Sequence, residues 1–576
     1  MSLSHEETDW DAIAAAVDAN RRPDPETVDP IWLPTLPVSA LARPAPAQPL
    51  PHSLDVAPPG LAPPPAMPPR GPWQPQSFGT PTRMPASQRK GKRPPRSRIL
   101  FALCFVASWA VLGWVLLVAS APKQPKAPFA VTVPVYPKAW DPRVADLAAF
   151  VEAHRGLTYK HPVPVQFLAE ADYIALFDTN ESSSDAATKA QIAANAAKAR
   201  DDAAILDAAG LAPAGYDPVA ASTTVAQTTT LGFFDPQADK VFVRGNTMTP
   251  ALRVVLVHEL THVLQSQWFT IKLGGANDLD VRAVVEADAI RIQDEYQATL
   301  PAADQTQAEA GNGASASSAA DLADVPAALV DQSYAPYVLG PMFVKTIADK
   351  GGNAAVDKLF TSFPGDRDLV NPALYTGTVD EIVVPVSAPS GATVIAQPHL
   401  WSMFDALTML DAWLPWRDAR TPFDAWTGGG YVSYRRADSV LCFTAAARFS
   451  TDVGASGFSN ALTLWAAASG STAVPARDGL TVSFEACARP AGAAAPPKAA
   501  FSSAQSVLIE NQLLGDPGEE TDPGKSVDRC VARKMVDDAT LAPLYTADTL
   551  TDAQRTMLAK ERDLARWTCT AEASAG

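Results

Sequence analysis

The sequence predicts an α+β fold preceded by one transmembrane helix and a disordered, proline-rich tail. Three observations carry this prediction: an uncharged apolar run of 21 residues at 99–119, a proline-rich stretch before it, and a mixture of helical and alternating apolar spacings after it. The expected organisation is a cytoplasmic tail with a basic block at 1–98, the transmembrane helix at 99–121, a linker at 122–138, a first folded domain at 139–380 and a C-terminal α+β region packed on it at 381–576.

The first 98 residues contain 22 of the 52 prolines. Proline fixes φ and removes a backbone donor, so a packed core is not expected there and we interpret the segment as a disordered tail. Its proline clusters could also dock in an SH3-like groove of a cytoplasmic partner, as extended polyproline segments do.

The apolar run at 99–119 is long enough to span about 30 Å of hydrocarbon. Six basic residues lie within positions 89–98, whereas only Lys123 and Lys126 follow the run closely. By the positive-inside rule the N-terminus is cytoplasmic, and the chain is a single-pass plasma-membrane protein with its folded part outside. A buried core helix is the alternative, and a cleaved signal peptide is disfavoured by the 98 preceding residues. The basic block is also expected to contact anionic lipid headgroups.

Charge and cysteine placement agree with this topology. Residues 1–98 hold 11 basic and 9 acidic residues, which leaves 35 basic and 53 acidic residues for the rest. Such an acidic region is a poor partner for nucleic acid. Four of the five cysteines follow the apolar run, and sequence order favours disulfides between Cys442 and Cys487 and between Cys530 and Cys569, although four cysteines allow three pairings.

The folded part is expected to begin with a helix that Asp141 caps and that runs to about Ala153, with Pro142 in its first turn. Four further elements follow before the central motif: a strand at 164–168, an alanine-rich helix at 186–209, and a hairpin of strands at 228–234 and 240–244.

Later segments continue the mixture of helices and strands. We expect a loose loop at 302–324, helices at 333–350 and 354–360, short strands at 431–434, 441–444 and 480–484, and a polar helical segment at 526–567.

The most informative motif is an HExxH sequence, His258-Glu259-Leu260-Thr261-His262, within an apolar segment that reads as a helix. Two histidines four residues apart lie on one helical face, one turn apart, so both imidazoles can reach a single Zn²⁺ ion. Glu259 between them is positioned to act as a general base on a water molecule. The alternative is a helix with two histidines and no metal.

A third ligand is needed to complete such a site. In metzincin-like sequences it is a histidine six residues after the second one, with a glycine three residues before that histidine, but here those positions are Trp268 and Gln265. Glu286, 24 residues after His262, lies in a helical segment with apolar flanks. A carboxylate in such surroundings needs a cation beside it, so we predict that Glu286 is a zinc ligand. A surface carboxylate paired with Arg282 is the alternative.

The segment HELTHVLQSQ followed by AVVEADA resembles the gluzincin metallopeptidases, the thermolysin-like branch of the zincins. It resembles more narrowly bacterial membrane-anchored proteins with HELTHALQ-type and LVEGDA-type helices. Weaker similarity lies at 232–236, 241–245, 336–340, 343–344 and 351–352, so the resemblance covers about residues 140–490. It implies a zincin-like domain in which an antiparallel sheet adjoins the active-site helix, with zinc held by His258, His262 and Glu286.

The sequence departs from the thermolysin pattern at one position. Four residues after the ligand glutamate that enzyme has an aspartate that orients a ligand histidine, whereas this chain has Ile290. The orienting group must come from elsewhere, with Asp280 and Asp288 as candidates. Related enzymes stabilise the oxyanion with a tyrosine or histidine, for which Tyr337 is favoured over Tyr334 and His399.

The resemblance and the motif together imply a zinc-dependent hydrolase that cleaves peptide bonds of a peptide or protein substrate in the cell envelope, with Glu259 as general base and Tyr337 as the oxyanion donor. Two other classes stay open. One is a catalytically degenerate relative that acts as an envelope binding or scaffold protein. The other is an envelope assembly or adhesion protein whose tail signals inward.

Overall fold

The computed structural model describes most of the chain from residue 136 onward. The described residues are 136–176, 197, 200–213, 216, 231–236, 238–271, 278–314, 326–375, 377, 381–490, 492–497, 500–515, 525–547 and 550–575. The predicted tail at 1–98, the transmembrane helix at 99–121 and most of the linker lie outside these residues. Among the described helices, none combines the length and the apolar character that a membrane crossing requires. The predicted mixture of helices and strands is present, with helices predominating.

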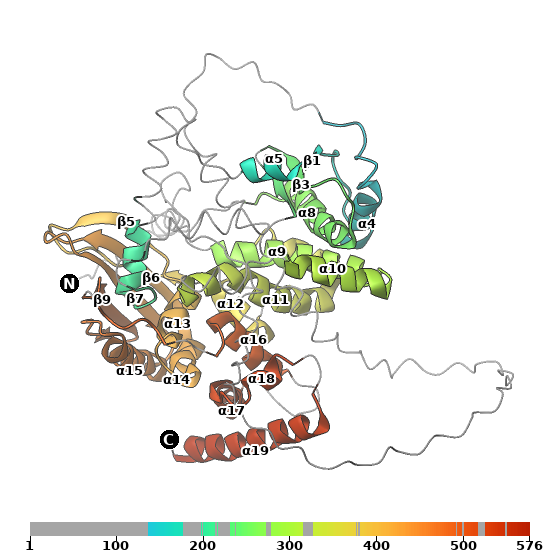
Figure 1. The fold of residues 1–576 in the computed structure, drawn as a ribbon. Coiled ribbons are helices and arrows are strands. Elements are labelled where there is room, and N and C mark those ends of the chain that lie inside the picture. The colour runs from blue at the N-terminus through green and yellow to red at the C-terminus, as the bar shows by residue number, and fades with distance from the viewer. Residues whose placement is uncertain are drawn as a thin grey trace, which may run out of the picture.

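A small sheet stands beside the motif helix (Figure 1). It consists of β1 (Val165–Leu168), β2 (Gly232–Asp235) and β3 (Lys240–Arg244) in the order β1-β3-β2. The β2–β3 hairpin is antiparallel, as the sequence predicted, but β1 pairs with β3 in parallel. The expected purely antiparallel sheet is therefore wrong. The long connection between β1 and β2, which includes α5 (Glu170–Ala175), permits the crossover that parallel pairing requires.

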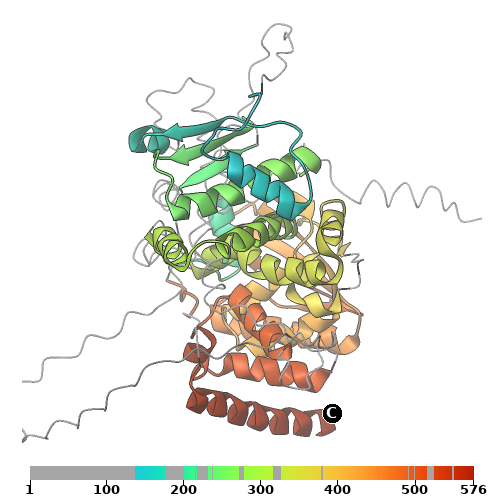
Figure 2. The same cartoon turned by 90° about the vertical axis from the view of Figure 1, so that its right-hand side faces the viewer.

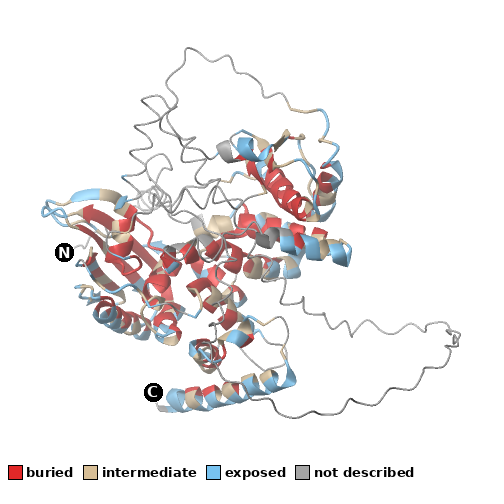
Figure 3. Cartoon of the chain, viewed as in Figure 1, coloured by how far each residue is buried: buried red, intermediate tan, exposed pale blue. Residues whose placement is uncertain are grey.

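The motif helix α8 (Pro250–Trp268) packs between this sheet and the helix α9 (Asp278–Gln297). Thr249 caps α8 by accepting the N–H of Leu252 at 3.1 Å on its side-chain oxygen, and Pro250 follows in the first turn. Nearly every residue of α8 up to Gln265 is buried (Figure 3), which explains why its apolar residues have no single-sided pattern.

Two expectations for the surrounding helices need correction. α4 (Ala145–Arg155) starts at Ala145, because Asp141 accepts the N–H of Arg143 on its side chain and so closes a turn before the helix. The expected loop at 302–324 contains the helix α10 (Ala302–Ala314); residues 315–325 lie outside the described part. Alanine is the best helix former, and Ala308 is fully buried in the core that includes α8.

Helix α11 (Ala327–Leu359) starts six residues before the expected 333 and breaks at Gly352, whose φ of 61° is left-handed. It packs along α9. The two helices come close together at Gly340, where a Cβ atom would collide with the backbone carbonyl of Ala283.

The second sheet has six strands in the order β4-β6-β7-β9-β8, with β5 also paired to β6. Its central antiparallel pairs place Cys442 directly opposite Cys487, and the two form a disulfide, as sequence order favoured. Helix α15 (Asp452–Ser469) packs against β7 and β9. The strands are β4 (Ile382–Val383), β5 (Thr393–His399), β6 (Trp426–Arg435), β7 (Leu441–Phe449), β8 (Ala476–Asp478) and β9 (Thr481–Cys487).

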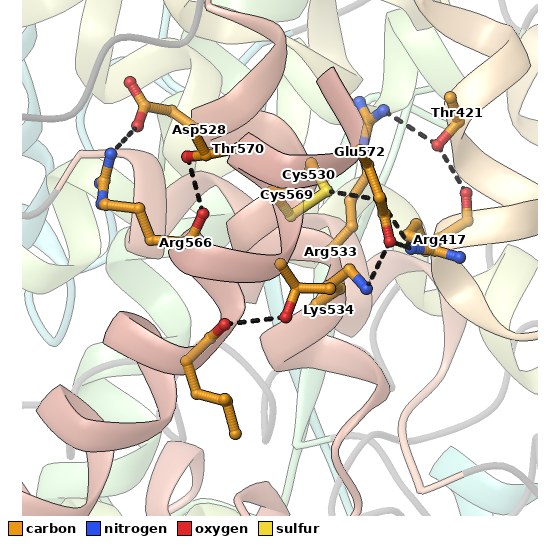
Figure 4. The surroundings of a disulfide bond; sticks show 12 residues. Arg417, Thr421, Asp528, Cys530, Arg533, Lys534, Arg566, Cys569, Thr570 and Glu572 are labelled. Carbon is orange, nitrogen blue, oxygen red and sulfur yellow. Dashed lines mark hydrogen bonds and ion pairs between the residues drawn. A yellow bond between two sulfur atoms is a disulfide. The ribbon is translucent and has the colours of Figure 1, made fainter. Parts of the chain in front are cut away.

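The C-terminal helices form the outer layer of the molecule (Figure 2), where α19 (Asp552–Ala575) lies alongside α17 (Ser526–Asp537). The disulfide between Cys530 and Cys569 joins these two helices (Figure 4), which is the second predicted pair. The remaining short elements are α12 (Asp366–Val370), η3 (Pro372–Leu374), α13 (Met403–Asp411), α14 (Trp416–Arg420), η4 (Thr421–Ala425), α16 (Ser503–Leu514) and α18 (Ala542–Tyr545).

Two hydrophobic cores meet at α9. The first core joins Ala283 and Ile290 of α9 to α11 and to the region after residue 380, so the C-terminal region packs on the preceding one as expected. The second core joins Ile292 and Tyr296 of α9 to α4, α8 and the small sheet. Consequently α9 is held firmly from both sides.

Three buried or half-buried carboxyl groups lie together where α12, the segment before β4 and α13 meet. Asp366 accepts the backbone N–H of Phe404 at 3.3 Å, and Asp405 accepts Nε2 of Gln332 at 2.8 Å. Burial, followed by the nearby charge of Asp366, raises the pKa of Asp405 to about 7 and that of Glu381 to about 8. The folded protein therefore keeps protons that the unfolded chain releases near pH 4.

The folded protein should become less stable as the pH rises from about 4 to about 7, and we expect Asp405→Asn to make this decrease smaller. A raised carboxyl pKa contributes stability that is complete below the unfolded pKa and disappears as pH rises through the folded pKa. Removing one such group should reduce the slope of the unfolding free energy against pH by up to about 1.4 kcal/mol per pH unit. Urea unfolding across this range, with Asp438→Asn as an exposed control, measures it; a slope equal to that of the wild type would contradict the prediction.

Candidate metal centre

His258, His262 and Glu286 come together at the contact between α8 and α9. The Nε2 atoms of the two histidines are 2.9 Å apart, and Oε2 of Glu286 is 3.2 Å from Nε2 of His258 and 3.5 Å from Nε2 of His262. His258 and Glu286 are 0% exposed and His262 is 2% exposed. The structure thus places the third predicted ligand beside the two motif histidines, in a fully buried position.

The local sequence explains why Glu286 turns inward. Its neighbours Ala283, Val284, Ala287 and Ile290 are buried in the first core, which fixes the rotation of α9 about its axis. The two histidines are one turn apart on α8 and therefore face α9 together. The apolar flanks of Glu286 were the signal for this arrangement in the sequence.

The outer nitrogen of His262 is held by an amide. Oε1 of Gln265 lies 2.8 Å from Nδ1 of His262, while Nε2 of Gln265 donates to the carbonyl of Val285 and to Oδ2 of Asp288, both at 3.0 Å. The two acceptors fix the orientation of the amide, so its oxygen faces the ring. Nδ1 of His262 then carries the proton, and the lone pair of Nε2 points to the cluster.

His258 makes a similar contact, with its Nδ1 atom 3.1 Å from Oε1 of Gln293, but Nε2 of Gln293 has no hydrogen-bond acceptor among the described residues. Two Nε2 lone pairs and a carboxylate therefore converge on one point. Among the described residues, the Glu286 carboxylate makes its polar contacts with the two motif histidines. Converging lone pairs in a buried site repel one another unless a cation lies between them. The donor set of two imidazoles and one carboxylate, with ligand atoms all within 4.8 Å of one another, fits a zinc ion.

Glu286 and His258 have the protonation states that metal binding requires. Burial would raise the pKa of Glu286, but His262 and then His258 outweigh it and lower this pKa to about 2. Burial and His262 lower the pKa of His258. Burial would also lower the pKa of His262, but the carboxylate of Glu286 outweighs it and raises this pKa. The carboxylate is thus ionised and His258 is neutral at neutral pH.

A buried ion-pair network supports Gln265 from behind. Asp288 accepts Nε of Arg155 at 2.8 Å and Nη2 of Arg291 at 3.0 Å, and Nη2 of Arg155 lies 2.6 Å from Oδ1 of Asp357. Arg155 and Asp288 are buried. Their ion pairs join α4 to α9 and α11, and the amide of Gln265 joins α8 to Asp288.

These contacts correct the expectation that Asp280 or Asp288 orients a ligand histidine. Asp288 acts one step further out, through Gln265, and Asp280 lies in the first turn of α9, where its Oδ1 accepts the N–H of Val281. Sequence reasoning did not identify Gln265 or Gln293. The available signal was spacing, since Gln265 follows His262 by three residues and Gln293 follows Glu286 by seven, which are same-face positions on a helix.

Glu259 lies between the two histidines but is held by the small sheet. Its Oε2 atom accepts the backbone N–H of Phe234 in β2 at 2.9 Å, and the residue is 1% exposed. This contact directs the carboxylate away from a ligand position while leaving it close enough to His262 to raise the pKa of that ring.

Of the three oxyanion candidates, the structure brings Tyr337 to the cluster. Tyr337 is 1% exposed on α11; burial raises its pKa well above the usual value, with further raising contributions from Glu286 and Glu259. Tyr334, three residues earlier, is buried in the first core. His399 lies on β5 of the second sheet with its ring against Tyr431, so no role beside the cluster follows for it.

Two other groups of potential ligands contain disulfides. These are Cys442 and Cys487 with Glu485, and Cys530 and Cys569 with Glu572. Their sulfur atoms are bonded to each other, so they are not metal thiolates.

Gln265→Ala is expected to weaken zinc affinity about 10- to 100-fold, as the loss of outer hydrogen bonds to ligand histidines does elsewhere. His262 would lose the acceptor that fixes its tautomer. Competition with a chromogenic chelator measures the constant. Gln267→Ala on the same helix is the matched control; equal affinities for the two alanine variants would contradict the assigned role.

Comparison with protein-family models, with curated proteins and with solved structures found no match to this chain.

Proposed function

We propose that this protein is a zinc-dependent peptidase anchored in the membrane by one helix, with its site on the extracytoplasmic side. The observation that supports it best is the convergence of His258, His262 and Glu286 through their lone pairs, with the non-ligand carboxylate of Glu259 next to them. This combination of three protein ligands and a separate base is what catalytic zinc sites of the HExxH type use.

When bound, zinc would lower the pKa of a water molecule to about 7 and polarise the substrate carbonyl. Glu259, oriented by the N–H of Phe234, takes a proton from the attacking water and then passes it to the leaving amine. The raised pKa of Tyr337 keeps its hydroxyl protonated at neutral pH, so it can donate a hydrogen bond to the oxygen of the carbonyl under attack.

One observation favours a second candidate, a catalytically degenerate relative in which metal serves structure and the protein binds or scaffolds envelope components. All four residues of the motif cluster, including Glu259, are at most 2% exposed. A closed site suits a structural metal, because a catalytic one must admit substrate.

The location outside the membrane is supported by the two disulfides, which form in oxidising compartments. The acidic balance after residue 98 and the basic block before the apolar run are consistent with it. A reporter that is active only in oxidising compartments should be active when fused after Gly576 and silent when fused near Pro69, and the reverse pattern would overturn this orientation.

The deciding experiment uses the full chain. Purified protein should contain about one zinc per chain and should cleave members of a peptide library, with cleavage lost on chelation and restored by zinc. One zinc per chain without cleavage of any library member would favour the structural candidate. Absence of zinc from protein prepared with zinc would refute both.

A further inference from the structure

Two buried polar groups lie next to each other beside the metal centre. The guanidinium of Arg282 interacts with the hydroxyl oxygen of Tyr337, and the buried Nη2 atom of Arg282 has no hydrogen bond of good geometry among the described residues. A buried donor without a partner is unfavourable, so this Nη2 atom needs an explanation. Tyr337 is on α11 and Arg282 on α9, so two elements contribute to one place.

The helices bring these groups next to Glu286. Arg282 precedes Glu286 by one helical turn and lies on the same face of α9. Tyr337 precedes Gly340 by three residues, and the absence of a side chain at Gly340 lets α11 approach Ala283 of α9. The pKa of Tyr337 also reflects how close the three side chains lie. Burial and the charge of Glu286 raise this pKa, and the guanidinium of Arg282 partly lowers it.

The partner that would suit Arg282 is an acid. Four other buried arginines in the described chain each have a carboxylate: Arg155 has Asp288, Arg489 has Asp207, and Arg420 and Arg533 share Glu510. Arg282 is half-buried, no carboxylate among the described residues pairs with its guanidinium, and Glu286 is engaged by the two histidines. The buried side of this guanidinium has no anion beside it, so this position suits an anionic ligand.

We propose that Arg282, oriented by Tyr337, binds the C-terminal carboxylate of a peptide substrate, which would make the protein a carboxypeptidase-type enzyme. This inference rests on the proposed function. The planar guanidinium can hold a carboxylate through two parallel hydrogen bonds, and the oxygen of Tyr337 helps to orient the guanidinium by accepting from Arg282.

The spacing limits how many residues such an enzyme would remove. One helical turn separates Arg282 from Glu286, which is about 6 Å along the axis of α9. An extended peptide covers about 3.3–3.6 Å per residue, so the carboxylate would lie one or two residues beyond the bond that is cut. In the reaction the oxygen of water bonds to the carbonyl carbon, the C–N bond breaks, and Glu259 carries the proton to the amine that leaves. The product is a free amino acid or a dipeptide.

The first test compares peptides that end in a free carboxylate with the same peptides ending in an amide. The wild type should cleave the free acids about 10- to 100-fold more efficiently, the range expected for hydrogen bonds to a charged group. Arg282→Met should lose this preference and Arg282→Lys should keep part of it. Arg253→Met on α8, whose side chain is 29% exposed and pairs with Asp146, is the matched control and should behave like the wild type.

The second test does not depend on catalysis. Binding of an N-acetyl dipeptide and of its C-terminal amide to the chelator-treated full chain is measured by calorimetry, after circular dichroism has verified the fold. The acid should bind the wild type and not Arg282→Met, and the amide should bind neither.

The outcomes separate this inference from the proposed function. Equal cleavage of acids and amides would overturn the carboxylate subsite while leaving a peptidase. Binding of the acid that survives Arg282→Met would overturn it as well. Absence of cleavage from both peptide classes, with Arg282-dependent binding of the acid retained, would refute the peptidase and keep the carboxylate site.

Discussion

Glu259→Gln is expected to bind zinc as tightly as the wild type and to lose about 10²- to 10⁴-fold in turnover, the usual contribution of a general base. Oε2 of Glu259 accepts the N–H of Phe234, and the glutamine side-chain oxygen can accept the same bond, so the orientation of the side chain should persist. The amide cannot take a proton from water, and only the proton transfer is removed.

Mass spectrometry measures the zinc content of the variant. The cleavage rate on one defined peptide measures its turnover. Glu295→Gln on α9 is the matched control, since Glu295 is 40% exposed and lies outside the cluster. It should keep both zinc and turnover. Loss of zinc in Glu259→Gln would mean that Glu259 is a ligand, and unchanged turnover would mean that another group is the base.

The features that sequence reasoning could predict depend on short spacings. The histidines of the motif are four residues apart on one helix, so their common face follows from helical geometry alone. The disulfide between Cys442 and Cys487 follows from two alternating segments that pair as neighbouring strands. Glu286 could be selected among nearby acids because its flanks are apolar, and a helix with apolar residues around a carboxylate must turn that carboxylate inward.

The features that could not be predicted from the sequence depend on contacts between distant segments. Arg155 and Asp288 are 133 residues apart, and nothing in the local pattern of α4 indicates that an arginine would be buried there. The parallel pairing of β1 with β3 likewise depends on how the long connection crosses the sheet. For Ala302–Ala314, glycine, serine and aspartate nearby favoured a loop, whereas burial of Ala308 favours the helix.

The position of α9 between two cores links stability to the metal centre. Residues before Ile290 pack with α11 and the C-terminal region, and Ile292 and Tyr296 pack with α8 and the small sheet. The candidate ligand Glu286 and the supporting Asp288 and Gln293 all belong to this helix. A metal that bridges α8 and α9 would therefore also join the two cores, and binding to the folded state alone would raise the stability of both.

Glu286→Gln is expected to weaken zinc affinity by more than the 10- to 100-fold that loss of an outer partner causes, because it removes one of three protein ligands. The glutamine has the shape of the glutamate, so packing of α9 should be retained, and thermal unfolding of the metal-free proteins should be similar. Adding zinc should raise the melting temperature of the wild type far more than that of the variant, since stabilisation grows with ligand concentration over the dissociation constant.

Asp294→Asn, the same change to an amide on the same helix, is the control for this experiment and should bind zinc like the wild type. Competition with a chelator series gives the affinities of all three proteins. If Glu286→Gln and Asp294→Asn bind zinc equally well, Glu286 is not a ligand. Its Oε2 atom, at 3.2 Å and 3.5 Å from the two Nε2 atoms, would then only form an ion pair with the histidines. If Asp294→Asn alone loses zinc, the third ligand lies about two turns further along α9, and the two-histidine half of the site stands without the carboxylate assigned here.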